Sequence, residues 1–289
     1  MATPVSTRYL PLSTGETIFY RTAGEEHTST VLLLHGFPSS SHQYRNLIPL
    51  LAATHRVIAP DLPGFGFTTA PEGYVYTFDN LTETIKTFLA TLPKTPKSYA
   101  IYIFDYGAPV GLRLALSNPA AVTAIVTQNG NAYEDGLTSF WDSLRTYWAS
   151  GAKKDRDSLL GLFTLETTKF QYTAGTKDVD AIAPESYTLD QVGLDRPGNN
   201  DIQLDLFYDY RKNLTLYPDF HAYFKSSQVP LLAVWGKNDP IFGPAGAEAY
   251  KKDLPNAEVH LLDAGHFVGE TNTREVAELM LEFFERHHI

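Results

Sequence analysis

The stretch "SYAIYIFDYGAPVG", residues 98–111, decides the fold of this chain. Residues 98–104 are mostly apolar, carry no charge and are rich in Ile and Tyr, a pattern that predicts a buried strand. Gly107, Pro109 and Gly111 follow and predict a tight turn that opens into a helix. Asp105 lies between the strand and the turn. The sequence therefore places a carboxylate where an apolar strand ends.

The same succession of apolar strand, short connection and helix recurs on both sides of this stretch. The expected elements are strands at 30–35, 55–59, 99–104, 122–127, 230–235 and 257–262, helices at 78–92, 110–116, 245–253 and 273–287, and a hairpin of strands 8–12 and 17–21. Continuous apolar strands that alternate with helices are typical of a mostly parallel sheet with helices on both faces. The predicted fold class is therefore α/β.

The composition changes between residues 132 and 227, where connections lengthen and Tyr, Asp and Thr become frequent. The alternation of strands and helices resumes afterwards. We therefore predict a core formed by residues 1–131 and 228–289, with residues 132–227 inserted after the sixth strand. In open parallel sheets, ligands bind beyond the carboxyl ends of the strands. The chemically interesting residues considered below all lie at such ends.

Charge and composition exclude several classes of function. The net charge of −10 argues against a nucleic-acid or anionic-membrane surface and is compatible with a small neutral substrate. The chain has no cysteine, which rules out disulfides, thiolate catalysis and cysteine metal sites. No apolar run approaches the ~18 residues of a membrane span, and no signal peptide is visible. We expect a cytoplasmic protein without nucleic-acid or membrane partners, whose oligomeric state the sequence leaves open.

Asp105 has two interpretations. A strand-to-helix elbow holds its central side chain at the edge of the sheet, in front of helix N–H groups, and presents it as a nucleophile. Alternatively, Asp105 caps the following helix, because Asp is a favoured capping residue. A serine in such an elbow needs a base before it can attack, whereas an aspartate is already ionised at neutral pH. The elbow motif usually has a small residue two positions before its central residue, and this chain has the larger Ile103 there.

Two further residues follow predicted strands later in the chain. Asp239 lies in "LLAVWGKNDPIF" and His266 lies in "LLDAGHFVGE". Taken alone, Asp239 is explained by a turn before proline, and His266 by packing. Their order after Asp105, with separations of 134 and 27 residues, matches a triad of nucleophile, acid partner and histidine base. Asp61 and Asp263 are less well placed and are better explained as supports of their own loops.

The motif "HGFP", residues 35–38, follows the predicted strand 30–35. Gly36 lets the backbone bend sharply and Pro38 fixes the turn. The backbone N–H groups of Phe37 and of Tyr106, the residue after Asp105, would then form an oxyanion hole. An ordinary Gly-Pro turn is the alternative.

Together these residues resemble the α/β-hydrolase superfamily, and within it the branch with an aspartate nucleophile. That branch holds the soluble epoxide hydrolases and the haloalkane and haloacid-type dehalogenases. The resemblance is carried by "HGFP", "DLPGFG", "FDYGAPVG", "VWGKNDPIF" and "DAGHF", and it covers the core. It implies the α/β-hydrolase fold, in which residues 132–227 correspond to a mainly helical cap.

The resemblance implies hydrolysis through an aspartyl ester, with epoxide hydrolysis to a vicinal diol as the expected reaction. Epoxide hydrolases similar to this chain use two cap tyrosines to hydrogen-bond the epoxide oxygen. The segment "DYRKN" nominates Tyr210 and "KFQYTAG" nominates Tyr172. The resemblance implies no metal and no organic cofactor. The expected partners are water and a small, apolar organic substrate.

Two alternatives remain open. Haloalkane dehalogenases that resemble this chain usually have Trp after the nucleophile and often Asn in the "HGNP" position, where this chain has Tyr106 and Phe37. Most epoxide hydrolases also carry that Trp. Fluoroacetate dehalogenases place arginines where this chain has Tyr106 and Pro109, so a small haloacid substrate is disfavoured. The second alternative is a non-catalytic protein that binds a small molecule. An esterase would need Ser at position 105.

Overall fold

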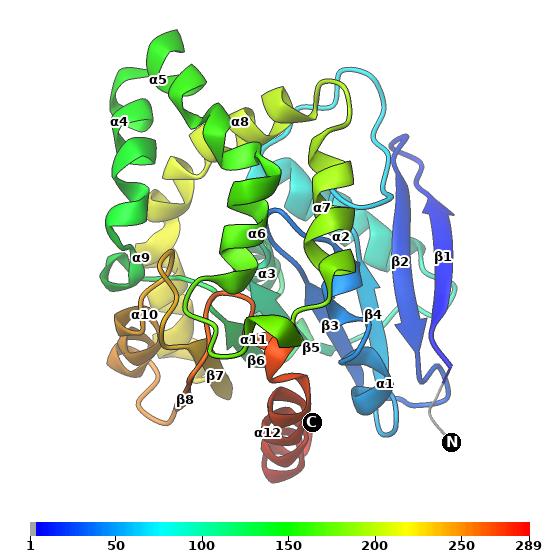
Figure 1. Ribbon diagram of the computed structural model, residues 1–289. Coiled ribbons are helices and arrows are strands. Elements are labelled where there is room, and N and C mark those ends of the chain that lie inside the picture. The colour runs from blue at the N-terminus through cyan, green and yellow to red at the C-terminus, as the bar shows by residue number, and fades with distance from the viewer. Residues whose placement is uncertain (1–3) are drawn as a thin grey trace.

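The computed structural model describes residues 4–289, whose strands form one eight-stranded sheet (Figure 1). The strands are β1 (Ser6–Pro11), β2 (Thr17–Ala23), β3 (Thr30–Leu34), β4 (Arg56–Pro60), β5 (Tyr99–Phe104), β6 (Val122–Gln128), β7 (Leu231–Gly236) and β8 (Glu258–Leu262). Their order across the sheet is β1-β2-β4-β3-β5-β6-β7-β8. The pairs β1–β2 and β2–β4 are antiparallel, and every pair from β4 to β8 is parallel. The predicted mostly parallel sheet is confirmed.

The helices fill the connections between these strands. They are α1 (Ile48–Leu51), α2 (Phe78–Thr91), α3 (Gly107–Ser117), α4 (Asp142–Ser150), α5 (Lys153–Asp157), α6 (Leu165–Thr173), α7 (Pro184–Leu194), α8 (Asn199–Asp209), α9 (Arg211–Ser227), α10 (Ala245–Ala249), α11 (Val268–Thr271) and α12 (Thr273–His287). The helix expected at 245–253 is shorter than predicted, because a 3₁₀ turn replaces it after Ala249. Within residues 4–289, no helix is long and apolar enough to cross a membrane.

Helices cover both faces of the sheet. Successive residues of a strand point to opposite faces, so each strand contributes apolar side chains to both. In β3, Leu32 and Leu34 pack into the apolar cluster on one face, and Val31 and Leu33 into the cluster on the other. Side chains of α2 and α3 belong to the first cluster, and side chains of α1 and α12 to the second. All residues of β3, β4 and β5 are buried. Such strands read as continuous apolar runs in the sequence.

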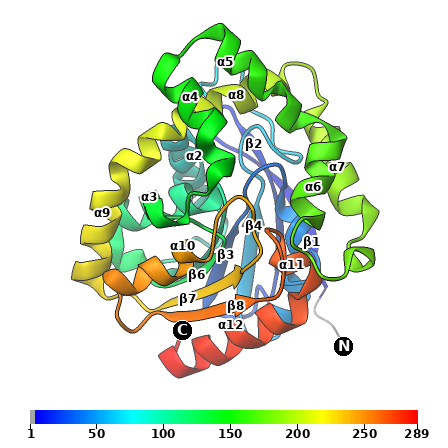
Figure 2. The same cartoon turned by 60° about the vertical axis from the view of Figure 1, so that its left-hand side comes forward.

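Helices α4 to α9 follow β6 and precede β7, so they occupy the helical insertion, the name used below for residues 132–227. In Figure 1, α4 to α8 gather at the upper end of the sheet while α12 lies at the lower end. Figure 2 shows the same separation from a second direction. The ring of Phe207 lies 5.1 Å from that of Phe37, and the ring of Tyr210 lies 5.8 Å from that of Tyr106. The insertion therefore contacts the residues that follow β3 and β5.

Candidate active site

Asp105 sits on a sharp backbone turn between β5 and α3. Its φ of 48° lies in the left-handed region, which residues other than glycine rarely adopt. A Cβ at Gly107 would lie 2.1 Å from the carbonyl oxygen of Leu34, and one at Gly36 would lie 2.3 Å from Oδ1 of Asp105. The turn therefore requires glycine at both positions. Strained backbone of this kind clusters at functional sites, and it forms the strand-to-helix turn expected from "FDYGAPVG".

The bulk of Ile103 is accommodated by a glycine on the neighbouring helix. A Cβ at Gly111 would lie 2.4 Å from Cγ2 of Ile103. In the usual strand-to-helix elbow, a small residue two positions before the central residue leaves room for the following helix. Here the missing side chain of Gly111 on α3 leaves that room for Ile103.

The Asp105 carboxylate is buried and accepts hydrogen bonds from two backbone N–H groups. The N–H of Phe37 donates to Oδ1 over 2.6 Å, and the N–H of Tyr106 also donates to the carboxylate. These are the two groups predicted to form the oxyanion hole. The N-cap position of α3 is occupied by Tyr106, whose side chain makes no capping hydrogen bond, and Asp105 lies one residue before it. Burial raises the pKa of Asp105 to about 6, although His266 and the two N–H donors oppose the rise.

His266 and Asp239 form a buried pair in direct contact. Nδ1 of His266 lies 2.7 Å from Oδ2 of Asp239. The carboxylate also accepts from Nδ2 of Asn129 and from the N–H of Ile241, each over 2.7 Å. Because a carboxylate accepts, Nδ1 of the neutral imidazole carries the proton and Nε2 is free to accept one. Nε2 is buried and has no hydrogen-bond partner among residues 4–289.

The surroundings of His266 raise its pKa. Burial alone would lower it, but the charge of Asp239, the hydrogen bond that His266 donates to Asp239 and the charge of Asp105 together exceed this effect. An ester on Asp105 would remove one of those charges. The imidazole would then bind its proton less tightly, and its neutral form, which can take a proton from water, would be favoured. The arrangement therefore suits a reaction in which His266 acts after Asp105 has reacted.

Two side chains at the carboxyl end of β6, the last residue Gln128 and the next residue Asn129, contact this pair, and neither was expected from the sequence. Asn129 donates to Asp239, and its Oδ1 accepts from the N–H of Gly236 over 3.0 Å. Nε2 of Gln128 donates to the carbonyl oxygen of His266 over 3.2 Å. The sequence signal that could have identified them is the polar run "QNGN" at the carboxyl end of the predicted strand 122–127, because Asp105 also follows the carboxyl end of a strand.

Tyr210 lies close to Tyr106, the residue after Asp105. It joins α8 to α9 and is buried, with its ring 5.6 Å from Phe78, 4.5 Å from Trp141 and 5.8 Å from Tyr106. Burial raises the pKa of Tyr210 well above its ordinary value, and the charge of Asp105 contributes to the rise. The structure thus brings Tyr210 into the electrostatic surroundings of Asp105.

Tyr172 lies in different surroundings. Its ring stacks on Phe267, the residue after His266, with ring centroids 3.7 Å apart. Its hydroxyl donates to Oδ2 of Asp190 over 2.5 Å and lies 3.4 Å from Oγ of Ser39. Tyr172 therefore packs beside the His266 segment, while its hydroxyl is directed to Asp190.

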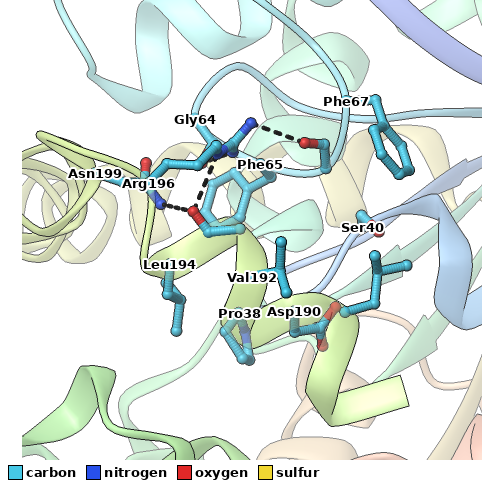
Figure 3. Close-up of a pocket in the computed structure, with 13 residues that line it drawn as sticks. Pro38, Ser40, Gly64, Phe65, Phe67, Asp190, Val192, Leu194, Arg196 and Asn199 are labelled. Atoms are coloured by element: carbon cyan, nitrogen blue, oxygen red, sulfur yellow. Dashed lines mark hydrogen bonds between the residues drawn. The ribbon is translucent and has the colours of Figure 1, made fainter. Parts of the chain in front are cut away.

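A cavity of about 110 Å³ lies between α7 and the loops that follow β3 and β4 (Figure 3). Its lining is mostly apolar and includes Pro38, Phe65 and Val192, with Asp190 as an acidic member. Burial raises the pKa of Asp190 to about 7, so this group is partly neutral at physiological pH. Because Pro38 directly follows Phe37, the cavity adjoins the turn that contacts Asp105.

Comparisons with known proteins agree with this architecture. Residues 29–273 match a family model described as alpha/beta hydrolase fold. The chain is 48% identical over 274 residues to the uncharacterized hydrolase YNR064C of Saccharomyces cerevisiae, covering 93% of this chain and 94% of that one. It is 30% identical over 264 residues to haloalkane dehalogenase 1 of Mycobacterium tuberculosis, covering 88% and 83% of the two chains.

A solved structure shares the fold. The structure described as "Epoxide hydrolase CorEH without ligand" is similar with a TM-score of 0.79 at 20% identity, covering 98% of this chain and 99% of that chain. The chain belongs to the α/β-hydrolase family, and its relatives indicate a hydrolase. The resemblance to the α/β-hydrolase superfamily and the fold class inferred from the sequence are confirmed.

Proposed function

We propose that this protein hydrolyses epoxides to vicinal diols through an ester formed on Asp105. The observation that carries the proposal is the buried Asp105 carboxylate, held at its turn by the N–H groups of Phe37 and Tyr106. A carboxylate can attack an sp³ carbon without prior deprotonation. Tyr210 supplies a phenol beside it that can donate to a leaving oxygen.

In the first step, an oxygen of Asp105 bonds to a ring carbon while the bond from that carbon to the epoxide oxygen breaks. The epoxide oxygen takes the hydroxyl proton of Tyr210, which becomes a phenolate, and the product is a hydroxyalkyl ester of Asp105. The hydroxyl of Tyr172 can donate to the epoxide oxygen only after its hydrogen bond to Asp190 is broken. We therefore assign the main donor role to Tyr210 and a secondary role to Tyr172.

In the second step, Nε2 of His266 takes a proton from water and the hydroxide adds to the ester carbonyl. The resulting oxyanion accepts hydrogen bonds from Phe37 and Tyr106 N–H, while Asp239 stabilises the imidazolium. Collapse of the intermediate breaks the bond from the Asp105 carbonyl carbon to the alkyl oxygen, which takes the proton of the added hydroxyl, so that the diol leaves and the Asp105 carboxylate is restored. The proton on His266 then passes back to the phenolate, so the net change is the addition of one water.

The groups that these two steps need are side chains, backbone N–H groups and water, so we propose a reaction without a metal or cofactor. The helical insertion acts as a cap in this proposal, because it contributes Tyr210 and because α7 forms one wall of the apolar cavity. The lining favours a small, apolar substrate.

Haloalkane dehalogenation is the second candidate. It is favoured by the 30% identity to haloalkane dehalogenase 1 of Mycobacterium tuberculosis. The same Asp105 ester would form with a halide as the leaving group, and no proton transfer to that group would be needed. Phe37, which replaces the Asn often found in dehalogenases, makes this candidate the weaker one, whereas Tyr106 departs from the Trp common to both classes.

The test is the intact mass of the His266→Gln variant after separate incubation with styrene oxide and 1-bromobutane. Loss of the base should leave the ester unhydrolysed, so we expect an adduct with the full mass of styrene oxide on the peptide that contains Asp105. The matched control is Asp105→Asn in the same background, which should form none. An adduct from 1-bromobutane alone would identify a dehalogenase. Absence of both adducts would contradict the covalent mechanism and support the binding protein.

A further inference from the structure

The side-chain hydroxyl of Tyr106 is buried and has no hydrogen-bond partner in the part of the chain that the structure describes. Tyr106 itself is only 1% exposed. Nearly all buried polar groups in folded proteins have a partner, so an exception requires an explanation. A phenylalanine would fill almost the same space without an unsatisfied hydroxyl. The Tyr106 hydroxyl therefore costs the free protein stability, and a bound molecule could supply the missing partner.

The phenol of Tyr106 lies where the core meets the helical insertion. Its neighbours are aromatic residues from the loop after β3, from α2 and from the insertion, with ring centroids 6.0 Å from Phe37, 4.9 Å from Phe78, 6.3 Å from Phe207 and 5.8 Å from Tyr210. The three phenylalanine rings carry no oxygen or nitrogen. The hydroxyl is therefore enclosed by apolar rings close to Tyr210, the donor assigned above.

The Asp105 carboxylate acts on this hydroxyl without bonding to it. Burial raises the pKa of Tyr106 well above its ordinary value, and the charge of Asp105 adds to the rise. The phenol therefore keeps its proton at neutral pH. The backbone N–H of the same residue donates to the carboxylate. Tyr106 thus uses its backbone to hold the nucleophile and leaves its side-chain hydrogen free to donate.

Tyr172, the second donor expected from the sequence, differs from Tyr106 in this respect. The Tyr172 hydroxyl donates to Oδ2 of Asp190 over 2.5 Å and would have to break that bond before it could serve a substrate. The Tyr106 hydroxyl has no such bond to break. Because removing a hydrogen bond between buried groups is costly, Tyr106 is the better placed of the two to assist Tyr210.

We propose that the Tyr106 hydroxyl is a further catalytic group, which donates a hydrogen bond to the epoxide oxygen. The proposal rests on the function proposed above, in which Tyr106 contributes only its N–H. As Asp105 bonds to the ring carbon and the carbon–oxygen bond breaks, negative charge develops on the epoxide oxygen. Tyr210 transfers its proton to that oxygen, while Tyr106 keeps its proton and stabilises the same oxygen through the hydrogen bond.

This role is confined to the first step. A hydrogen bond strengthens when its acceptor gains negative charge, so the donor lowers the barrier to ring opening. Once the ester has formed, the former epoxide oxygen is a neutral alcohol and takes no part in hydrolysis. The Tyr106 hydroxyl therefore favours substrates whose leaving group is an oxygen.

The test is Tyr106→Phe, which deletes the hydroxyl and keeps the N–H that contacts Asp105. The rate of adduct formation with styrene oxide, measured by quenching and mass spectrometry in the His266→Gln background, isolates the first step. We expect Y106F to slow it by about 10- to 100-fold. The matched control is Tyr99→Phe at the amino end of β5. That position is roughly 20 Å from Asp105 along the strand, so the control rate should stay within about twofold.

Thermal denaturation provides a second measurement, in which the expected change has the opposite direction. Because the hydroxyl lacks a partner in the free protein, Y106F should melt about 2–5 °C higher than its parent although it reacts more slowly. A side chain needed only for packing would lose stability and rate together.

Two results would overturn this role of Tyr106. One is an adduct that forms as fast in Y106F as in the His266→Gln reference. The other is a lower melting temperature, which would show that the hydroxyl has a partner within the protein. Failure of the proposed function has a different signature, since the His266→Gln reference would then form no styrene oxide adduct before position 106 is changed.

Discussion

The two sides of the candidate active site are held in different ways. Asp105 and Asp239 come from loops at the carboxyl ends of core strands, and backbone N–H groups hold both carboxylates. Tyr210 and Tyr172 come from the helical insertion, and other side chains hold their hydroxyls. Backbone contacts are set by the sheet, whereas side-chain contacts change with single substitutions. We therefore expect changes in the core to abolish every reaction, and changes in the insertion to select among substrates.

The largest expected effect tests the core side of this comparison. Asp105→Asn should lower conversion of both styrene oxide and 1-bromobutane by at least about 10⁴-fold, because a neutral amide does not attack carbon. Product formation followed by gas chromatography measures the loss. Circular dichroism confirms that the variant is folded. Activity within about 100-fold of the unsubstituted protein would show that Asp105 is not the nucleophile.

The next effect is the pH dependence of the first step. Asp105 attacks only when ionised, and burial raises its pKa to about 6. Below that pH, kcat/KM for styrene oxide should fall about tenfold for each pH unit. Since His266 lowers the Asp105 pKa, this acid limb should move to higher pH in the adduct-forming reaction of His266→Gln. Return of samples to pH 8 controls for unfolding, and an identical limb in both proteins would refute the coupling.

Tyr210 and Tyr172, the two candidate proton donors of the helical insertion, should differ in their effect on epoxide turnover. Tyr210→Phe should slow epoxide turnover by about 10- to 100-fold, because the leaving oxygen loses its proton donor. Tyr172→Phe should slow it by less than about threefold, because the Tyr172 hydroxyl is directed to Asp190. Steady-state rates with styrene oxide distinguish the two, and equal losses would show that Tyr172 releases Asp190 during the reaction.

The smallest expected effect concerns stability. Asp105→Asn should abolish activity but should stabilise the folded protein. The Asp105 pKa rises from 3.8 to about 6 on folding, so the folded state bears the cost of the buried charge. That cost is absent below the unfolded pKa, grows as the pH rises between the two values, and is complete above about pH 6. Asp105→Asn should therefore raise the free energy of unfolding by about 1–3 kcal/mol at pH 7.5.

Urea unfolding at two pH values measures this gain. Near pH 4, just above the unfolded-state pKa of 3.8, Asp105 is neutral in the folded state and only partly ionised in the unfolded state, so most of the cost is gone and the variant and the unsubstituted protein should differ little. A gain of the same size at both pH values would point to a packing change rather than to removal of a buried charge.

The elements of the core could be predicted because their signals are local. Every residue of β3, β4 and β5 is buried, and a strand between two helical layers appears in the sequence as an unbroken apolar run. The order of the residues along the chain predicted that Asp239 and His266 lie together. In the structure, Oδ2 of Asp239 lies 2.7 Å from Nδ1 of His266.

The supporting residues could not be predicted in the same way, because their partners are distant in the sequence. Asn129 and Asn131 are the same residue type two positions apart, yet Asn129 holds Asp239, 110 residues away, and Asn131 holds Tyr217, 86 residues away. Tyr217 is one of 17 tyrosines. Its spacing of seven residues from Tyr210 places both on one helix face, but only the fold shows that this face meets Asn131.

The short segment "QNGN", residues 128–131, begins with the last residue of β6 and contacts both the core and the helical insertion. Gln128 holds the backbone of His266, Asn129 holds Asp239, and Asn131 holds Tyr217. For protein engineering, this divides the chain into parts with different tolerance. Under the proposed function, libraries that vary the cavity wall on α7 should change substrate choice. A one-residue insertion or deletion within 128–131 should instead displace His266, Asp239 and Tyr217 together, and no single change in the insertion would restore all three.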